Sequence, residues 1–293
     1  MASFMQMNID GLAQAGRLRT GETYRAALNS FMKFMRGKDV PLKDMDTELM
    51  MNYELYLKTK GACMNTVSFY MRILRAAYNR AVDCGIVRQR FPFKRVYTGV
   101  DKTVKRAVTC GTIRRLKDID LSASRSMSFA RDMFLFSFYT RGMSFVDMAY
   151  LKKSDLHNGM LTYRRKKTGQ MLVVRWEPCM QDIVDRYSMR YSVYLLPIIT
   201  SPWKDERVQY KNAMGLVNRH LKKIGELLGT IHPLTMYVAR HSWASVARGK
   251  SIPLSVISEG MGHDSEKTTR IYLTGLDTGA VDRANTEVLN ELI

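Results

Sequence analysis

The stretch Leu161-Thr-Tyr-Arg-Arg-Lys-Lys-Thr-Gly-Gln-Met-Leu-Val-Val-Arg-Trp176 decides the fold class of this 293-residue chain. It contains two runs of strand-forming residues, and they flank the polar segment Lys167-Thr-Gly-Gln170. A short polar segment with a glycine between two such runs is typical of a hairpin turn. We therefore predict a β-hairpin over residues 161–176.

The chain on both sides of this hairpin has the apolar spacing of helices. Tyr24, Leu28, Phe31 and Met35, for example, recur at intervals of three and four residues, as one buried helix face requires. The same pattern predicts helices over residues 20–37, 47–58, 64–84, 112–119, 125–138, 145–151, 180–191, 208–228, 237–248, 252–260 and 267–272. The expected fold class is therefore mainly α with a small β-hairpin or sheet (α+β).

The segment between Arg88 and Arg106 differs from the helical stretches around it. It holds seven basic residues and one acid, Asp101, together with Pro92 and Gly99, and it shows no sustained period. Such a segment is typical of a linker that either follows a phosphate backbone or is a solvated loop. We expect a helical domain over residues 1–97, a basic linker over 98–106, and a second, larger domain over 107–293.

The charge of the chain indicates a polyanionic partner. Lys and Arg number 46 against 27 acidic residues, which gives a formal net charge of +19. Nucleic acid and an anionic membrane surface are the two candidates, besides a merely soluble basic protein. The strongly apolar run 133–139 is far shorter than the ~20 residues that span a bilayer, and we expect neither a membrane anchor nor a signal peptide. Four scattered cysteines fit a reducing cytoplasm.

Basic groups and a tyrosine gather in three segments near the C-terminus. Ala239-Arg240-His241-Ser-Trp243 is expected in a helix, Gly260-Met-Gly-His-Asp-Ser265 in a turn, and Thr268-Thr-Arg-Ile-Tyr272 at a helix end. In a strongly cationic protein, this combination indicates phosphoryl transfer to a phenolic nucleophile. Guanidinium groups match the developing charge on an attacked phosphodiester, and a cationic pocket lowers the pKa of a phenol from its usual value of about 10.

These motifs resemble the C-terminal signature of the tyrosine recombinase (phage integrase) family, His-x-x-Arg, then Gly-His, then Tyr. The matching positions are Tyr237-Val-Ala-Arg240, Gly262-His263 and Tyr272, and the separations of 23 and nine residues are similar to those of the family. The stretches 23–34 and 65–81 resemble the family's core-binding (SAM-like) domain. The resemblance implies that residues 107–293 form the catalytic domain.

The resemblance also implies a role for each matching residue. Tyr272 would attack the scissile phosphate, Arg240 would clamp it, and His263 would donate a hydrogen bond to it or assist proton transfer. Lys167 on the hairpin would protonate the leaving 5′ oxygen. Lys166 stays open as the alternative, because a slip of one residue along a strand turns a side chain to the opposite face. No cofactor and no metal are expected.

Two positions depart from the family pattern. Tyr237 stands where the family has a histidine. A phenol can donate a hydrogen bond but cannot carry a proton near neutral pH, so its role is either binding or simple packing. His241 next to Arg240 is an alternative contributor or a structural residue, and Trp243 is expected in the core.

The second departure concerns the family's first arginine, which lies in a Gly-x-Arg-x-x-Glu/Asp pattern. The matching run here is Gly142-Met-Ser144-Phe-Val-Asp147, so Ser144 occupies the place of the arginine. Arg141, about one helical turn earlier, is the expected substitute. Arg164 or Arg165 on the hairpin is the alternative.

The function that the resemblance implies is site-specific cleavage and rejoining of DNA through a 3′-phosphotyrosyl intermediate. The implied partners are double-stranded DNA with a specific recombination site, three further copies of the chain in a synaptic tetramer, and accessory DNA-bending proteins. The tail from Val288 would dock on its own domain or on a neighbouring protomer. We expect a cytoplasmic, nucleoid-associated enzyme. Two alternatives are a type IB topoisomerase-like enzyme and a DNA-binding accessory protein with a degenerate site.

Overall fold

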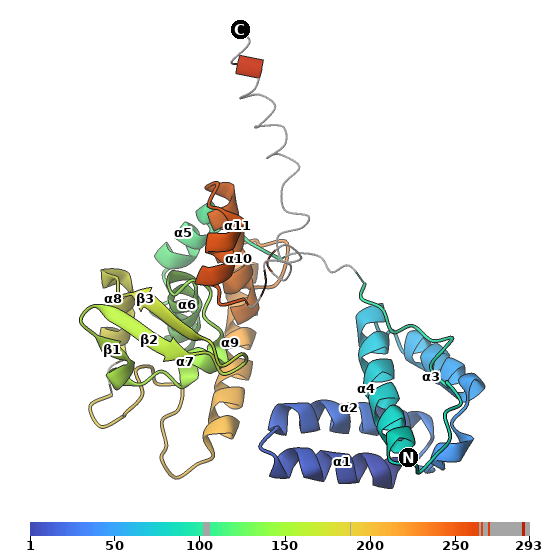
Figure 1. Ribbon diagram of the computed structural model, residues 1–293. Coiled ribbons are helices and arrows are strands. Elements are labelled where there is room, and N and C mark those ends of the chain that lie inside the picture. Colours follow the sequence, from blue (N-terminus) through green and yellow to red (C-terminus); the bar gives the residue numbers. More distant parts are fainter. Residues whose placement is uncertain (102–105, 188, 264, 266–268, 270–288, 291–293) are drawn as a thin grey trace. The chain divides into compact units, whose positions relative to one another are not determined.

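The computed structural model describes residues 1–101, 106–187, 189–263, 265, 269 and 289–290. These residues divide into two compact units, Met1–Thr103 and Val104–Ile293. Figure 1 shows that the first unit contains only helices, whereas the second combines helices with a small sheet. The architecture is thus mostly helical with one antiparallel sheet, as the sequence predicts.

The first unit is built from four α-helices and a short 3-10 helix. Their bounds are α1 Ala2–Gln14, α2 Leu18–Phe34, η1 Leu42–Asp44, α3 Thr47–Thr59 and α4 Met64–Asp83. The core between them is rich in methionine and aromatic side chains, and Phe31, Tyr53 and Tyr78 are fully buried in it. Tyr53 contacts Phe31 edge to face with ring centroids 5.2 Å apart, a geometry that aromatic pairs favour.

The basic segment after α4 packs on this first unit. Phe93 and Val96 are buried in the core of the unit, and the hydroxyl of Tyr78 donates to the carbonyl of Arg88 at 3.1 Å. Further along, the hydroxyl of Ser68 donates to the carbonyl of Gly99. The stretch from Arg88 to Gly99 is therefore part of the first unit.

The second unit is organised around α6, whose residues from Ala130 to Ser137 are almost all buried. This helix packs against α5, α8, α9 and α10. The helices of the unit are α5 Cys110–Asp118, α6 Arg125–Tyr139, α7 Phe145–Ala149, η2 Lys153–Asp155, α8 Pro178–Arg186, α9 Glu206–Leu227, α10 Met236–Gly249 and α11 Leu254–Gly260.

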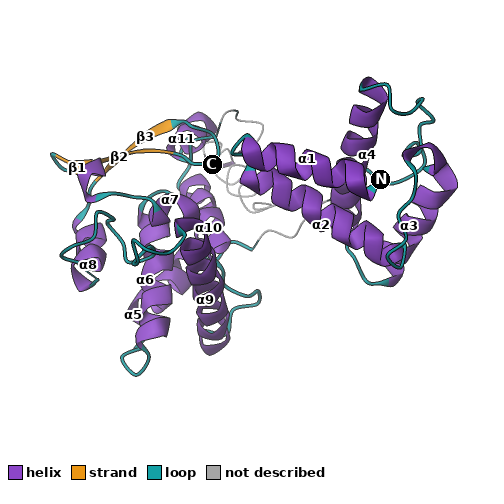
Figure 2. Cartoon of the chain, turned by 90° about the horizontal axis from the view of Figure 1, so that it is seen from below, coloured by secondary structure: helices purple, strands orange, loops and turns teal. Residues whose placement is uncertain are grey.

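The strands of the second unit form a three-stranded antiparallel sheet in the order β1-β2-β3. The bounds are β1 Leu156–His157, β2 Met160–Arg164 and β3 Met171–Arg175, and Figure 2 shows the strands at one side of the helices of this unit. Leu161 pairs with Val174 and Tyr163 with Leu172, and these four side chains face the core. The predicted hairpin is confirmed, and β1 adds a short strand to it.

The helix predicted over 180–191 is shorter than expected. α8 ends at Arg186, and Tyr191 is 93% exposed. Tyr187 is the C-cap residue of α8, and its hydroxyl donates to Asp132 of α6 at 2.9 Å. Burial, followed by the neighbouring Asp132 carboxylate, raises the pKa of Tyr187, so the phenol remains a donor.

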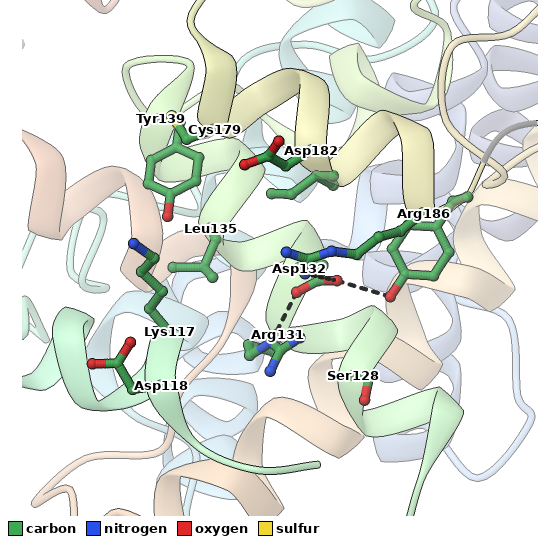
Figure 3. A pocket seen from close by; sticks show the side chains of 12 residues that line it. Lys117, Asp118, Ser128, Arg131, Asp132, Leu135, Tyr139, Cys179, Asp182 and Arg186 are labelled. Atoms are coloured by element: carbon green, nitrogen blue, oxygen red, sulfur yellow. Dashed lines mark hydrogen bonds and ion pairs between the residues drawn. The ribbon is translucent and has the colours of Figure 1, made fainter. Parts of the chain in front are cut away.

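Asp132 lies at the wall of a cavity of about 500 Å³ between α5, α6 and α8 (Figure 3). Its carboxylate is fully buried and accepts from Arg131 at 2.8 Å, Arg186 at 3.1 Å and Tyr187. A buried carboxylate is tolerated when cations and hydrogen-bond donors surround it. The network therefore ties α8 to α6.

Candidate active site

Arg240 is a deeply enclosed cation of the predicted site. α10 begins at Met236, so Arg240 lies in its second turn, where it is 8% exposed. Its Nη1 donates to the carbonyl of Gly142 at 2.7 Å, and its Nη2 donates to the carbonyl of Met261 at 2.6 Å. The guanidinium is thus fixed between the segment before α7 and the turn after α11.

His263 meets Arg240 directly. The ring Nε2 of His263 lies 3.0 Å from Nη2 of Arg240, and its Nδ1 lies 2.7 Å from the hydroxyl oxygen of Thr269. Because a guanidinium has no acceptor, Nε2 must accept and the proton of the neutral ring is on Nδ1. The predicted pairing of an arginine and an imidazole from two distant segments is therefore present in the structure.

Gly262 explains why a glycine precedes this histidine. Its φ is +63°, and an added Cβ would lie 2.8 Å from both Cδ of Arg165 and Cδ1 of Leu172. The left-handed backbone and the close packing each exclude a side chain. The turn that carries His263 therefore lies tightly against the start of the hairpin turn.

The two candidate lysines of the hairpin have different surroundings. Lys167 is exposed in the turn between β2 and β3. The backbone N–H of Lys166 donates to Asp147 at 2.8 Å, and its Nζ lies 4.2 Å from the centroid of the Tyr150 ring. Both lysines are exposed in the turn, and the amine of Lys166 lies over an aromatic face.

Ser144 and Arg141 flank the glycine that contacts Arg240. Ser144 is the N-cap of α7, and its hydroxyl donates to Asp147 at 2.6 Å. Arg141 has a left-handed φ of +60°, and its Nη1 donates to the carbonyl of Val173 on β3 at 3.3 Å. The serine therefore has a structural partner in its own helix turn, and the arginine contacts the sheet.

Tyr237 lies in the first turn of α10 and is 59% exposed. Its ring stands edge-on to the imidazole of His241, with centroids 4.5 Å apart. Trp243 is partly buried beside α11, as expected of a core residue. Tyr272, the predicted nucleophile, and most of the predicted tail from Val288 lie outside the described residues.

Sequence reasoning gave too little weight to Arg165 and Tyr163 on the hairpin. Both are only 7% exposed. Burial raises the pKa of Tyr163, and so does the Asp147 carboxylate, whereas the guanidiniums of Arg165, Arg240 and Arg141 act in the opposite direction. Three arginines thus act electrostatically on one buried phenol. The alternation of buried Leu161, Tyr163 and Arg165 is the sequence signal for this arrangement.

Comparison with known proteins shows which proteins the chain resembles. Residues 1–96 match the phage integrase SAM-like domain. The tyrosine recombinase XerC of Roseiflexus castenholzii (strain DSM 13941 / HLO8) is 22% identical over 258 residues, which cover 85% of this chain and 81% of the relative. The first 96 residues therefore match a phage integrase SAM-like domain, and the chain as a whole is similar to a tyrosine recombinase.

Solved structures share the fold of this chain. A lambda integrase dimer bound to a COC′ core site matches with a TM-score of 0.72 at 17% identity, over 95% of this chain and 96% of that chain. The site-specific recombinase XerH bound to palindromic difH matches with a TM-score of 0.68 at 16% identity, over 98% and 84% of the two chains. No described helix combines the length and the apolar character that crossing a bilayer requires.

Proposed function

We propose that the recombinase cleaves and rejoins double-stranded DNA at a specific site, with Tyr272 as the nucleophile. The observation that carries this proposal is the direct contact between Arg240 and His263, which come from two segments that the family signature also joins. A buried guanidinium and an imidazole next to each other form a binding site for one phosphate group. The formal charge of +19 supports a polyanionic substrate.

In the cleavage step, the phenolic oxygen of Tyr272 attacks the scissile phosphorus and the bond to the 5′ oxygen breaks. The phenolic proton leaves to solvent, and Lys167 gives a proton to the departing 5′ oxygen. Arg240 binds the non-bridging oxygens, where negative charge develops. His263 donates to one of them as the imidazolium, whose Nε2–H then turns from Arg240 to the phosphate. Attack of a 5′ hydroxyl on the 3′-phosphotyrosyl bond reverses these steps and rejoins the strand.

Tyr237 and Arg141 are the remaining candidates for phosphate contacts. Tyr237 exposes its phenol next to the helix turn that carries Arg240, and a hydroxyl group can donate to a phosphate oxygen. Arg141 is adjacent to Gly142, whose carbonyl holds Arg240. Both residues therefore lie near Arg240 in the fold, and replacing either one tests whether it contacts the phosphate.

The assembly on DNA is also part of the proposal. Lambda integrase and XerH, which share this fold, have been solved with DNA, and lambda integrase as a dimer. We expect four protomers to join two recombination sites, with the C-terminal tail docked within or between protomers, and accessory DNA-bending proteins to assist. We expect the enzyme to act on DNA in the nucleoid, and therefore in the cytoplasm.

Covalent trapping on a nicked suicide substrate tests this function. The nick lets the short 5′-hydroxyl fragment diffuse away, so that an active enzyme stays joined to the 3′ phosphate. We expect wild type to form this adduct, Tyr272→Phe to lose it while still binding DNA, and Tyr163→Phe to retain it. Tyr163 is the matched control because the charge of Arg240 also acts on its phenol, but the side chain is buried.

An adduct formed by Tyr272→Phe would show that the nucleophile is a different residue. DNA binding without any adduct from wild type, on substrates that carry the native target site, would show a DNA-binding accessory protein. Relaxation of supercoiled DNA without exchange of partners would show a topoisomerase.

A further inference from the structure

Arg165 is a buried cation at the end of a row of core residues. Leu161, Tyr163 and Arg165 alternate along β2 and its extension, and all three face inwards. The backbone N–H of Arg165 donates to the carbonyl of Gln170 at 2.8 Å, so the inward position is held by the hairpin itself. Burial of a guanidinium is costly unless anions or acceptors surround it, and such a position therefore calls for a partner.

The partners that the described residues offer Arg165 leave donor capacity unused. Its Nη1 donates to the carbonyl of Gly262, and its Nε forms an ion pair with Oδ2 of Asp147 at 3.9 Å, a distance too long for a hydrogen bond. The carboxylate of Asp147 already accepts from the hydroxyl of Ser144 and from the N–H of Lys166. A guanidinium has five N–H donors in a fork that fits two oxygens of a phosphate.

Arg165 and Arg240 lie on the same short piece of backbone. Arg240 donates to the carbonyl of Met261 and Arg165 to the carbonyl of Gly262, the residue that follows it. Both carbonyls immediately precede His263, whose ring contacts Arg240 at 3.0 Å. Two buried guanidiniums and one imidazole therefore converge on one turn. Asp147 of α7 accepts from the backbone N–H of Lys166 and so connects the hairpin to α7.

The other candidates for a second phosphate-binding cation are less well placed. The side chain of Ser144 is too short and caps α7. Arg141 is directed to the carbonyl of Val173 on β3, at 3.3 Å. By contrast, Arg165 is buried and is held by the hairpin backbone. Its side chain donates to the carbonyl of Gly262, the residue before His263.

We propose that Arg165 supplies the second phosphate-binding guanidinium of this site, the role that Ser144 leaves vacant. Arg240 and Arg165 then each bind one non-bridging oxygen of the scissile phosphate. The side chain comes from the hairpin instead of the start of α7, and Asp147 joins the two elements through Ser144 and Lys166. The inference rests on the proposed function of the site.

Single-turnover cleavage by Arg165→Ala, Arg165→Lys and Arg164→Ala tests the proposal. Arg164 is the matched control because it is the neighbouring arginine on the exposed face of β2 and bonds only the turn carbonyl of Gly169 among the described residues. Loss of one preorganised donor to a developing charge typically lowers a rate about 10²- to 10³-fold. We expect a loss of this size for Arg165→Ala, a smaller one for Arg165→Lys, and a change below about threefold for Arg164→Ala.

A neutral substrate separates phosphate binding from a structural role. A methylphosphonate at the scissile position replaces one charged oxygen by a methyl group, which removes the need for one guanidinium. The ratio of methylphosphonate to phosphodiester cleavage should therefore rise about 100-fold or more in Arg165→Ala, for at least one of the two diastereomers. Equal losses on both substrates would overturn the proposal, and so would near-normal cleavage of DNA by Arg165→Ala.

The same experiment distinguishes failure of this inference from failure of the proposed function. If wild type forms no covalent adduct with either substrate, the proposed function itself is wrong. If wild type is active and Arg141→Ala, instead of Arg165→Ala, shows the loss and the methylphosphonate rescue, the second guanidinium belongs to Arg141.

Discussion

The carbonyl oxygen of Gly142 accepts a hydrogen bond from Nη1 of Arg240 at 2.7 Å, and the two backbones lie close together. A Cβ added to Gly142 would be 2.7 Å from Cα of Arg240 and 2.9 Å from its Cγ. Gly142 also has a φ of +75°. The glycine therefore allows the segment before α7 to approach α10 and to orient the guanidinium.

Substitution of Gly142→Ala should displace Arg240 as well as strain the backbone. A left-handed conformation costs an L-residue about 1–2 kcal/mol, and the contact with Arg240 adds a clash with backbone, which cannot yield as a flexible side chain can. We expect at least about a tenfold fall in single-turnover cleavage, equivalent to about 1.4 kcal/mol in the barrier, together with a lower free energy of unfolding.

Gly159→Ala is the control for this prediction. Gly159 has a similar φ of +72° in the turn between β1 and β2, but an added Cβ there meets no atom within 4 Å. This variant should lose about 1–2 kcal/mol of stability through backbone strain alone and cleave DNA at the wild-type rate. Equal cleavage by the two variants would show that the contact between Gly142 and Arg240 has no role in the reaction.

Lys167→Ala should slow cleavage of an ordinary phosphodiester, because the 5′ oxygen then leaves without a proton. A 5′-bridging sulfur makes the leaving group a thiolate, whose conjugate acid has a pKa near 8.5 and which needs no general acid. We expect a loss of about 10²-fold or more with oxygen and near-wild-type cleavage with sulfur. Quantified adduct formation on both substrates measures this effect.

Lys166→Ala serves as the comparison, since the amine of Lys166 lies over the ring of Tyr150 at 4.2 Å. The variant should cleave both substrates alike, with at most a small loss of stability from the missing cation–π contact. Rescue by sulfur in Lys166→Ala and not in Lys167→Ala would assign the proton transfer to Lys166.

The parts of the fold that depend on local pattern could be predicted from the sequence. The hairpin, the long helices and the meeting of Arg240 with His263 follow from alternation, apolar spacing and a motif that fixes which segments converge. α1 could not be predicted because only Met5, Asn8 and Ile9 of its residues are buried and no side chain caps its first turn. Its stability comes from packing on α2, which no local signal reveals.

The role of the hairpin arginines required the three-dimensional structure. The alternation of β2 indicates that Arg165 faces inwards, but it does not show which loop lies opposite. That loop is the Gly262 turn, which is 97 residues away in sequence and is brought there by the packing of α10 on α6. The position of a cation relative to a site formed by distant segments is a tertiary property, and Ser144 in the motif signals only that a substitute is needed.

The last prediction concerns stability away from the site, at the buried carboxylate of Asp132. Asp132→Ala removes the shared acceptor of Arg131, Arg186 and Tyr187, so that their donors lose a partner inside the cavity wall (Figure 3). Removal of one partner from a buried charged network costs about 3–5 kcal/mol, and denaturant unfolding should show a loss in this range.

Asp118→Ala is the matched control, because Asp118 lines the same cavity but is exposed, and such surface changes stay within about 0.5 kcal/mol. A similar stability of the two variants would show that the Asp132 network does not stabilise the packing of α8 on α6.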